Sequence, residues 1–280
     1  MSSCTYGARS CGRMGQHNEP AKEGTIVKTS TLPRQRLKTF MATREEILAW
    51  IDENGCLVIA VGVLKGGTGK TTSAIFFALY LAVMLGLKVV VVDTDDNSQT
   101  VDNWYRIREQ RDEKVAFDIV SYDPKDEEGS DLDDVIEALK EEYQVVIVDS
   151  GGAGKEAYWE MCKVANMLVL PVAPSGFEIS RIKASLRQAS KGTKANSALR
   201  VSVYLVRCSG NNTLAEEQRP VLQAIVSAED PAKVQVSLVP EEFQISGSPD
   251  YIRSWETTPK RPHLEEFGHL FRHLMKGIVA

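Results

Sequence analysis

The residues with the clearest chemical use lie in one short loop. The nine residues from Leu64 to Thr72 read LKGGTGKTT and follow the apolar run CLVIAVGV. Glycines let the backbone turn its N–H groups inward around an anion, and the start of a helix adds a partial positive charge. Lys70 can reach the β- and γ-phosphates of a nucleotide, and the Thr71 hydroxyl can ligate Mg²⁺. A glycine turn without a ligand is the alternative, and the position directly between a strand and a helix disfavours it.

Three aspartates follow two other apolar runs. Asp93 and Asp95 occur in VVVVDTDDNSQT, and Asp149 occurs in YQVVIVDSGGAG. One aspartate after an apolar strand is common and is weak evidence by itself. Ligands in open α/β sheets bind beyond the carboxyl ends of the strands. The loop and the two acidic segments, in this order and spacing, therefore predict one shared site.

The elements that would position these residues can be read from the rest of the chain. Short apolar runs alternate with segments long enough for helices, and the runs are continuously apolar, as in strands covered on both faces. They span residues 56–63, 88–93, 117–123, 144–149, 166–172, 201–206 and 234–240. This pattern predicts an α/β fold: a doubly wound, mostly parallel sheet flanked by helices, with right-handed crossovers.

The ends of the chain differ from this middle part. Residues 1–40 are poor in large apolar groups and carry a net charge of +5, against −10 for the remainder, which predicts a basic, disordered arm. Residues 41–55 are expected to form a helix with Thr43 as N-cap, Glu46 three residues later and Gly55 beyond its end. Residues 56–280 would then form the nucleotide-binding domain.

Cysteine usage and hydropathy indicate a cytoplasmic protein. The five cysteines are odd in number and include no C-x-x-C pair, and Cys56 and Cys162 have apolar neighbours, as reduced core thiols do. No apolar stretch follows the first basic residues, so we expect no signal peptide. The apolar run over residues 73–87 is short for a membrane span and predicts a buried core helix.

The glycine loop resembles the deviant Walker A motif, K-G-G-x-G-K-[ST], of the ParA/MinD superfamily of P-loop ATPases. The first glycine of the usual P-loop falls at Leu64, and Lys65 follows it. The resemblance implies ATP and Mg²⁺ as cofactors and a homodimer that forms on ATP. Lys70 would bind ATP within its own subunit, and Lys65 would reach the ATP of the partner. The implied nucleotide-binding residues are Lys65, Gly66, Gly67, Thr68, Gly69, Lys70, Thr71 and Thr72.

The acidic segments resemble the next two motifs of that superfamily. In its second motif, the later aspartate positions the attacking water, a role that falls here to Asp95. The sequence departs from the usual D-x-D-P-Q at Asp96 and Asn97. Asp149 would hold Mg²⁺ through water together with Thr71, and Gly151 and Gly152 would let the loop follow the γ-phosphate. The resemblance covers about residues 56–280, and it leaves Arg207 either near adenine or simply on the surface.

Two surface features bear on the partner of the ATPase. Residues 180–200 hold six basic groups and no acidic one: Arg181, Lys183, Arg187, Lys191, Lys194 and Arg200. They would either bind non-specific DNA, as ParA-type relatives do, or form a solvated helix face. The C-terminal segment 263–280 has a helical apolar stripe, which would either lie on a membrane, as in MinD-type relatives, or pack on the core. We expect the core-packed helix.

The resemblance leaves several functions to compare. An iron–sulfur carrier would need paired cysteines near the switch, and Cys162 stands alone. A cofactor-biosynthesis ligase is disfavoured by Lys65 and the basic segment, and a tyrosine kinase by the lack of tyrosines after Tyr251. The favoured interpretation is a ParA-like partition ATPase with weak hydrolysis, associated with the nucleoid when ATP is bound and stimulated by a centromere-binding, ParB-like protein. A MinD-like membrane-positioning ATPase is the alternative.

Overall fold

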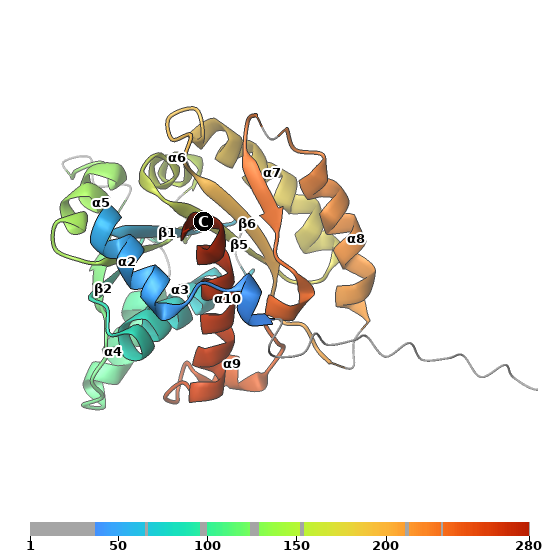
Figure 1. Cartoon of the computed structure of the whole chain (residues 1–280). Helices are drawn as coiled ribbons and strands as arrows, with labels where there is room; N and C mark the ends of the chain where they lie inside the picture. Colours follow the sequence, from blue (N-terminus) through green and yellow to red (C-terminus); the bar gives the residue numbers. More distant parts are fainter. Residues whose placement is uncertain are drawn as a thin grey trace, which may run out of the picture. The chain divides into compact units, whose positions relative to one another are not determined.

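The computed structural model contains one seven-stranded sheet in the order β3-β2-β4-β1-β5-β6-β7 (Figure 1). Every pair of neighbouring strands is parallel. The structure describes residues 37–64, 67–95, 100–123, 129–151, 154–210, 213–230 and 232–279. The strands are β1 (Leu57–Val61), β2 (Val89–Asp93), β3 (Asp118–Ser121), β4 (Val145–Asp149), β5 (Met167–Val172), β6 (Arg200–Leu205) and β7 (Gln235–Leu238).

The predicted strands are confirmed, and their burial explains the continuous apolar runs. All residues of β1, β2, β4 and β5 are buried. The edge strands β3 and β7 are partly exposed, and they carry polar as well as apolar side chains. A strand in the middle of the sheet packs on helices through both faces, and therefore every position along it favours an apolar residue.

Helices cover both faces of the sheet (Figure 1). One face packs against α2 (Arg44–Asn54), α3 (Lys70–Leu79), α4 (Thr100–Gln110) and α10 (Arg261–Val279). The other packs against α5 (Leu132–Lys140), α6 (Gly154–Val164), α7 (Gly176–Gly192) and α8 (Leu214–Ser227). Shorter elements are η1 (Lys38–Phe40), a π-helical segment η2 (Tyr80–Met84) that continues α3, η3 (Glu241–Phe243) and α9 (Pro249–Arg253).

Helix α2 has the predicted cap and belongs to the same core as the sheet. The Thr43 hydroxyl accepts from the Glu46 backbone N–H, and the Glu46 carboxylate accepts from the Thr43 N–H. Ile47 and Ile51 are buried in the core on the α10 side. Lys276 of α10 forms an ion pair with Glu46 at 3.0 Å. The basic arm expected over residues 1–40 lies almost entirely outside the described residues.

The C-terminal helix packs on the core, as expected. Its apolar stripe is buried through Leu264, Phe267, Leu270, Phe271, Leu274 and Met275. The Phe267 ring stacks on Phe76 of α3 at a centroid distance of 5.2 Å. Within the described residues, no helix combines the length and the apolar character needed to cross a membrane.

Candidate functional site

The glycine loop joins the end of β1 to the start of α3. Gly67 and Gly69 have φ angles of 82° and 89°, in the left-handed region that glycine adopts without a steric penalty. Helix α3 begins at Lys70, directly after Gly69. The backbone is therefore turned at the helix N-terminus, where its unpaired N–H groups can face an anion. Lys65 and Gly66 lie outside the described residues.

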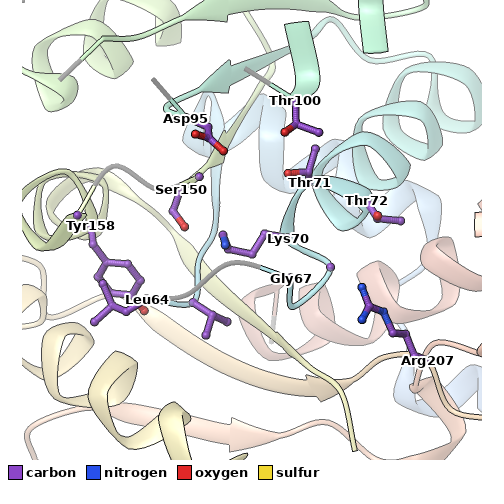
Figure 2. A pocket seen from close by; sticks show the side chains of 14 residues that line it. Leu64, Gly67, Lys70, Thr71, Thr72, Asp95, Thr100, Ser150, Tyr158 and Arg207 are labelled. Carbon is purple, nitrogen blue, oxygen red and sulfur yellow. The ribbon is translucent and has the colours of Figure 1, made fainter. Parts of the chain in front are cut away.

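A cavity of about 500 Å³ opens above this loop (Figure 2). Lys70 lies near its middle, Asp95 and Ser150 lie to one side, and Arg207 lies at the opposite side. The structure thus brings predicted site residues from four separate segments, namely the glycine loop, Asp95, Gly151 and Arg207, to one cavity. Its lining residues are Val63, Leu64, Gly67, Gly69, Lys70, Thr71, Thr72, Asp95, Thr100, Ser150, Gly151, Gly154, Tyr158 and Arg207.

Thr71 and Asp149 lie against each other at the base of the site. The Thr71 hydroxyl donates a 2.6 Å hydrogen bond to Oδ2 of Asp149. Asp149 is fully buried, and this burial raises the pKa of its carboxyl group to about 6. Its other oxygen, Oδ1, accepts no hydrogen bond from the described residues. A hydroxyl beside a buried carboxylate with an unused oxygen is a donor set that suits Mg²⁺, directly or through water.

Lys70 is a buried cation, with only 6% of its surface exposed. Burial lowers the pKa of its ammonium group, while the nearby carboxylates of Asp149 and Asp95 oppose that shift. A cation withdrawn from water but placed beside an open cavity interacts strongly with any anion that enters the cavity, because solvent screening there is reduced.

The two aspartates after β2 have different surroundings. Asp93 is 2% exposed and accepts from the backbone N–H groups of Val101, Asp102 and Asp95. It therefore holds the start of α4 in place. Asp95 instead lines the cavity and lies close to Gly151. A Cβ added to Gly151 would lie 2.5 Å from the Cβ of Asp95. Only a glycine at position 151 lets the two loops approach so closely. Asp96, Asn97 and Gly152 lie outside the described residues.

Four buried side-chain polar atoms have no hydrogen-bond partner among the described residues. They are Thr68 Oγ1, Asp149 Oδ1, Ser150 Oγ and the Tyr158 hydroxyl. Asp149 contacts Thr71 of the site, Thr68 belongs to the glycine loop, and Ser150 and Tyr158 line the cavity. Buried polar groups are nearly always paired. Their concentration at one place indicates a site that is completed by a ligand or by water.

Comparisons with known proteins agree with this geometry. The family described as ATPase MipZ matches residues 57–207, which is more than half of the chain. The chain belongs to the MipZ ATPase family. It is therefore an ATP hydrolase, and its resemblance to the ParA/MinD superfamily is confirmed. No curated protein matches the sequence.

Solved structures share the fold of this MipZ-family chain at low sequence identity. Apo McdA from Cyanothece has a TM-score of 0.61 at 15% identity over 78% of this chain and 99% of its own. The structure of pNOB8 ParA bound to nonspecific DNA has a TM-score of 0.53 and 14% sequence identity. The match covers 79% of this chain and 99% of the ParA chain. Cobyrinic acid a,c-diamide synthase from Mycobacterium smegmatis, solved with ADP and magnesium, has a TM-score of 0.54 and 17% sequence identity. The match covers 79% of this chain and 96% of the synthase chain. The fold alone thus does not separate a partition protein from a synthase.

A smaller cavity of about 250 Å³ adjoins the loop on the Arg207 side. Its walls include Gly69 and Thr72 of the loop, Val206 and Arg207 after β6, and apolar side chains from residues 245–252 and α10. Arg207 has a φ of 59°, unusual for a residue other than glycine. A mostly apolar cavity beside the phosphate loop suits a flat aromatic ring. Sequence reasoning left Arg207 either near adenine or on the surface, and it missed residues 245–252.

The predicted DNA-binding residues of this MipZ-family chain are exposed. Arg181, Lys183, Arg187, Lys191, Lys194 and Arg200 all lie on the surface, and none forms an ion pair within the described parts of the chain. Lys183, Arg187 and Lys191 follow one another at four-residue spacing on α7, so they share one face of the helix. We call these three residues the basic stripe.

Proposed function

We propose that the chain is a ParA-like partition ATPase. In this proposal, two ATP-bound subunits form a dimer that binds DNA without sequence preference and releases it after hydrolysis, so that a plasmid or other DNA cargo is segregated. The observation that carries it is the basic stripe, a row of exposed cations that form no ion pair among the described residues, on a chain of net charge −5. The pNOB8 ParA, which shares the fold, was solved on nonspecific DNA.

The cavity supports a division of labour around ATP. Lys70 and the loop amides would bind the β- and γ-phosphates, and Thr71 and Asp149 would hold Mg²⁺. When bound, Mg²⁺ neutralises charge on the phosphates as the terminal phosphoryl group is transferred. Asp95 would orient the attacking water, because its carboxylate lines the cavity whereas that of Asp93 is occupied by the start of α4. Arg207 and the smaller cavity would receive the base.

The face that carries the cavity also supports dimerisation on ATP. Phe177 and Ile252 are the two most exposed large apolar side chains among the described residues, at 81% each. Ile252 lines the smaller cavity, and Phe177 lies in the first turn of α7, just beyond the carboxyl end of β5. Both would be buried if a second subunit covered this edge of the sheet. Lys65 of that subunit would then reach the ATP in trans.

The direct test measures DNA binding in three nucleotide states. Fluorescence anisotropy with unrelated duplexes should show binding with ATP, little with ADP and little without nucleotide. Replacing Lys183, Arg187 and Lys191 with alanine should weaken binding to all sequences alike. Each lost phosphate contact should flatten the slope of log K against log salt by about 0.9.

A matched control keeps the same change in net charge. Lys88, Lys140 and Lys276 are ion-paired with acidic neighbours outside α7. Their triple alanine variant should bind DNA as the wild type does. If both triple variants lose binding equally, net charge and not the stripe is responsible.

The alternative, a membrane-positioning ATPase, is disfavoured by the C-terminal helix. Such a function needs an apolar face that is available to lipid, and the apolar stripe of α10 is buried in the core. Co-sedimentation with anionic liposomes in the presence of ATP tests it, and lipid binding without DNA binding would replace the partition proposal. A ParB-like activator would appear as a protein that raises ATP turnover only in the presence of DNA.

A further inference from the structure

The glycine loop is attached to helix α7 as well as to the sheet. Gly62, just after β1, donates its backbone N–H to Val169 of β5, as a continuation of the sheet. Two residues later the neighbouring strand no longer provides a partner. The backbone N–H of Leu64 instead donates to the hydroxyl of Ser185 at 3.1 Å. Leu64 lines the ATP cavity, so the loop begins at a point held by α7.

Ser185 is well placed to hold the loop firmly. It is fully buried in the middle of α7, and its neighbours Ile182 and Leu186 are fully buried in the core on that face of the sheet. A hydroxyl in such a position has no access to water, so it cannot exchange the Leu64 N–H for a water molecule. Serine has only a moderate helix propensity, so helix propensity does not explain why a serine occupies this position.

The same turn of α7 carries the basic stripe on its opposite side. Lys183 and Arg187 are two residues before and after Ser185, and residues two apart on a helix point in nearly opposite directions. Both cations are exposed, whereas Ser185 faces inward to the loop. A single rigid turn therefore contacts the nucleotide loop with one side and presents cations to solvent with the other.

We propose that Ser185 is a positioning residue for ATP, which fixes the start of the nucleotide loop and ties it to the basic stripe. A displacement of α7 by phosphates bound to Lys183 and Arg187 moves the backbone of Leu64, and ordering of the loop by ATP holds α7. The second half of this statement rests on the proposed function. By linkage, ATP then raises the affinity for DNA by the same factor as DNA raises the affinity for ATP, typically about 5- to 150-fold.

The test compares Ser185→Ala with Ser180→Ala. Ser180 lies on the same helix, is exposed, and donates only to the carbonyl of Phe177. In Ser185→Ala we expect faster amide exchange at Leu64. We also expect affinity for a non-hydrolysable ATP analogue to fall about five- to tenfold, the effect of one lost hydrogen bond. Ser180→Ala should match the wild type in both measurements.

The link to DNA is measured as a ratio. Affinity for the ATP analogue is determined by calorimetry with and without a short duplex. The wild-type ratio should fall toward one in Ser185→Ala and stay unchanged in Ser180→Ala. A residue that only stabilises the fold would lower the melting temperature and leave both the analogue affinity and the ratio intact, and that result would overturn the proposal.

The outcomes separate this inference from the proposed function. If the wild type binds no DNA in any nucleotide state, the proposed partition function is wrong. Two measurements, amide exchange at Leu64 and affinity for the ATP analogue, then decide whether Ser185 positions the loop. If the wild type shows the DNA effect and Ser185→Ala keeps it in full, the link through Ser185 is wrong and the partition function stands.

Discussion

The hydroxyl of Thr71 lies 2.6 Å from Oδ2 of Asp149, although the two residues are 78 positions apart in the chain. The sheet order brings them together: β1 pairs with β4, and Val61 at the end of β1 is in register with Asp149. The loop after β1 carries Thr71 into the first turn of α3, directly above that strand end. The pair of side chains that we propose to hold Mg²⁺ is therefore brought together by the pairing of two neighbouring parallel strands.

Lys70→Ala should abolish ATP binding while the fold remains intact. The ammonium group is the buried cation of the cavity, and no neighbouring side chain in the described loop replaces its charge. Calorimetry should detect no binding, and circular dichroism should match the wild type. Lys88→Ala, which removes an exposed cation elsewhere, serves as the control. Normal ATP affinity in Lys70→Ala would remove the phosphate-binding role of the loop.

Asp95→Ala should retain ATP but lose hydrolysis, by about two orders of magnitude or more, because the attacking water loses the carboxylate that orients it. ATP-bound dimers should then persist in light scattering. Asp93→Ala should behave differently and lower the stability by about 0.5–2 kcal/mol, since Asp93 caps the start of α4. Wild-type turnover in Asp95→Ala would transfer the catalytic role to another aspartate.

Asp149→Asn should stabilise the nucleotide-free protein at neutral pH. Burial raises the pKa of this carboxyl from about 4 in the unfolded chain to about 6. The folded state therefore holds the proton more tightly, and stability is lost as the pH rises from about 4 to 6, by about 3 kcal/mol at most. Melting temperatures of the wild type and the variant should diverge over this range and stay parallel above pH 7. Equal curves would show that the carboxylate is not destabilised by burial.

Lys65→Ala should separate nucleotide binding from assembly. In the ParA/MinD superfamily this lysine acts on the partner's ATP, so the variant should keep measurable ATP affinity and lose ATP-dependent dimerisation and hydrolysis. Size-exclusion chromatography with light scattering measures the dimer. A variant that still dimerises on ATP would show that Lys65 does not act in trans.

Phe177→Ser should weaken the ATP-dependent dimer about tenfold or more, because one large apolar side chain contributes about 1.5–3 kcal/mol when it is buried. ATP binding at low protein concentration should be unchanged, since Phe177 does not line the cavity. Val83→Ser is the control, because Val83 is an exposed apolar residue on the π-helical segment that follows α3. Equal dimer affinity in the two variants would place the interface elsewhere.

The sequence by itself determined the strands, the capped helix α2, the core-packed α10 and the glycine loop between β1 and α3. Each of these depends on local chemistry: continuous apolar runs, a Thr43–Glu46 capping pair, an apolar helical stripe, and glycines before Lys70. Such signals are contained within a few consecutive residues, so no knowledge of distant contacts is needed to recognise them.

Only the tertiary structure decided which side chains share the site. The division between Asp93 and Asp95 depends on the position of α4, and the smaller cavity depends on residues 245–252, which carry no motif. Ser150, Tyr158 and Ser185 are ordinary residues in sequence. They acquire their roles because parallel strands place loops from distant segments at one edge of the sheet, and a helix packed across that edge presents one particular side chain to the loop. The pattern of a single segment contains no information about that packing.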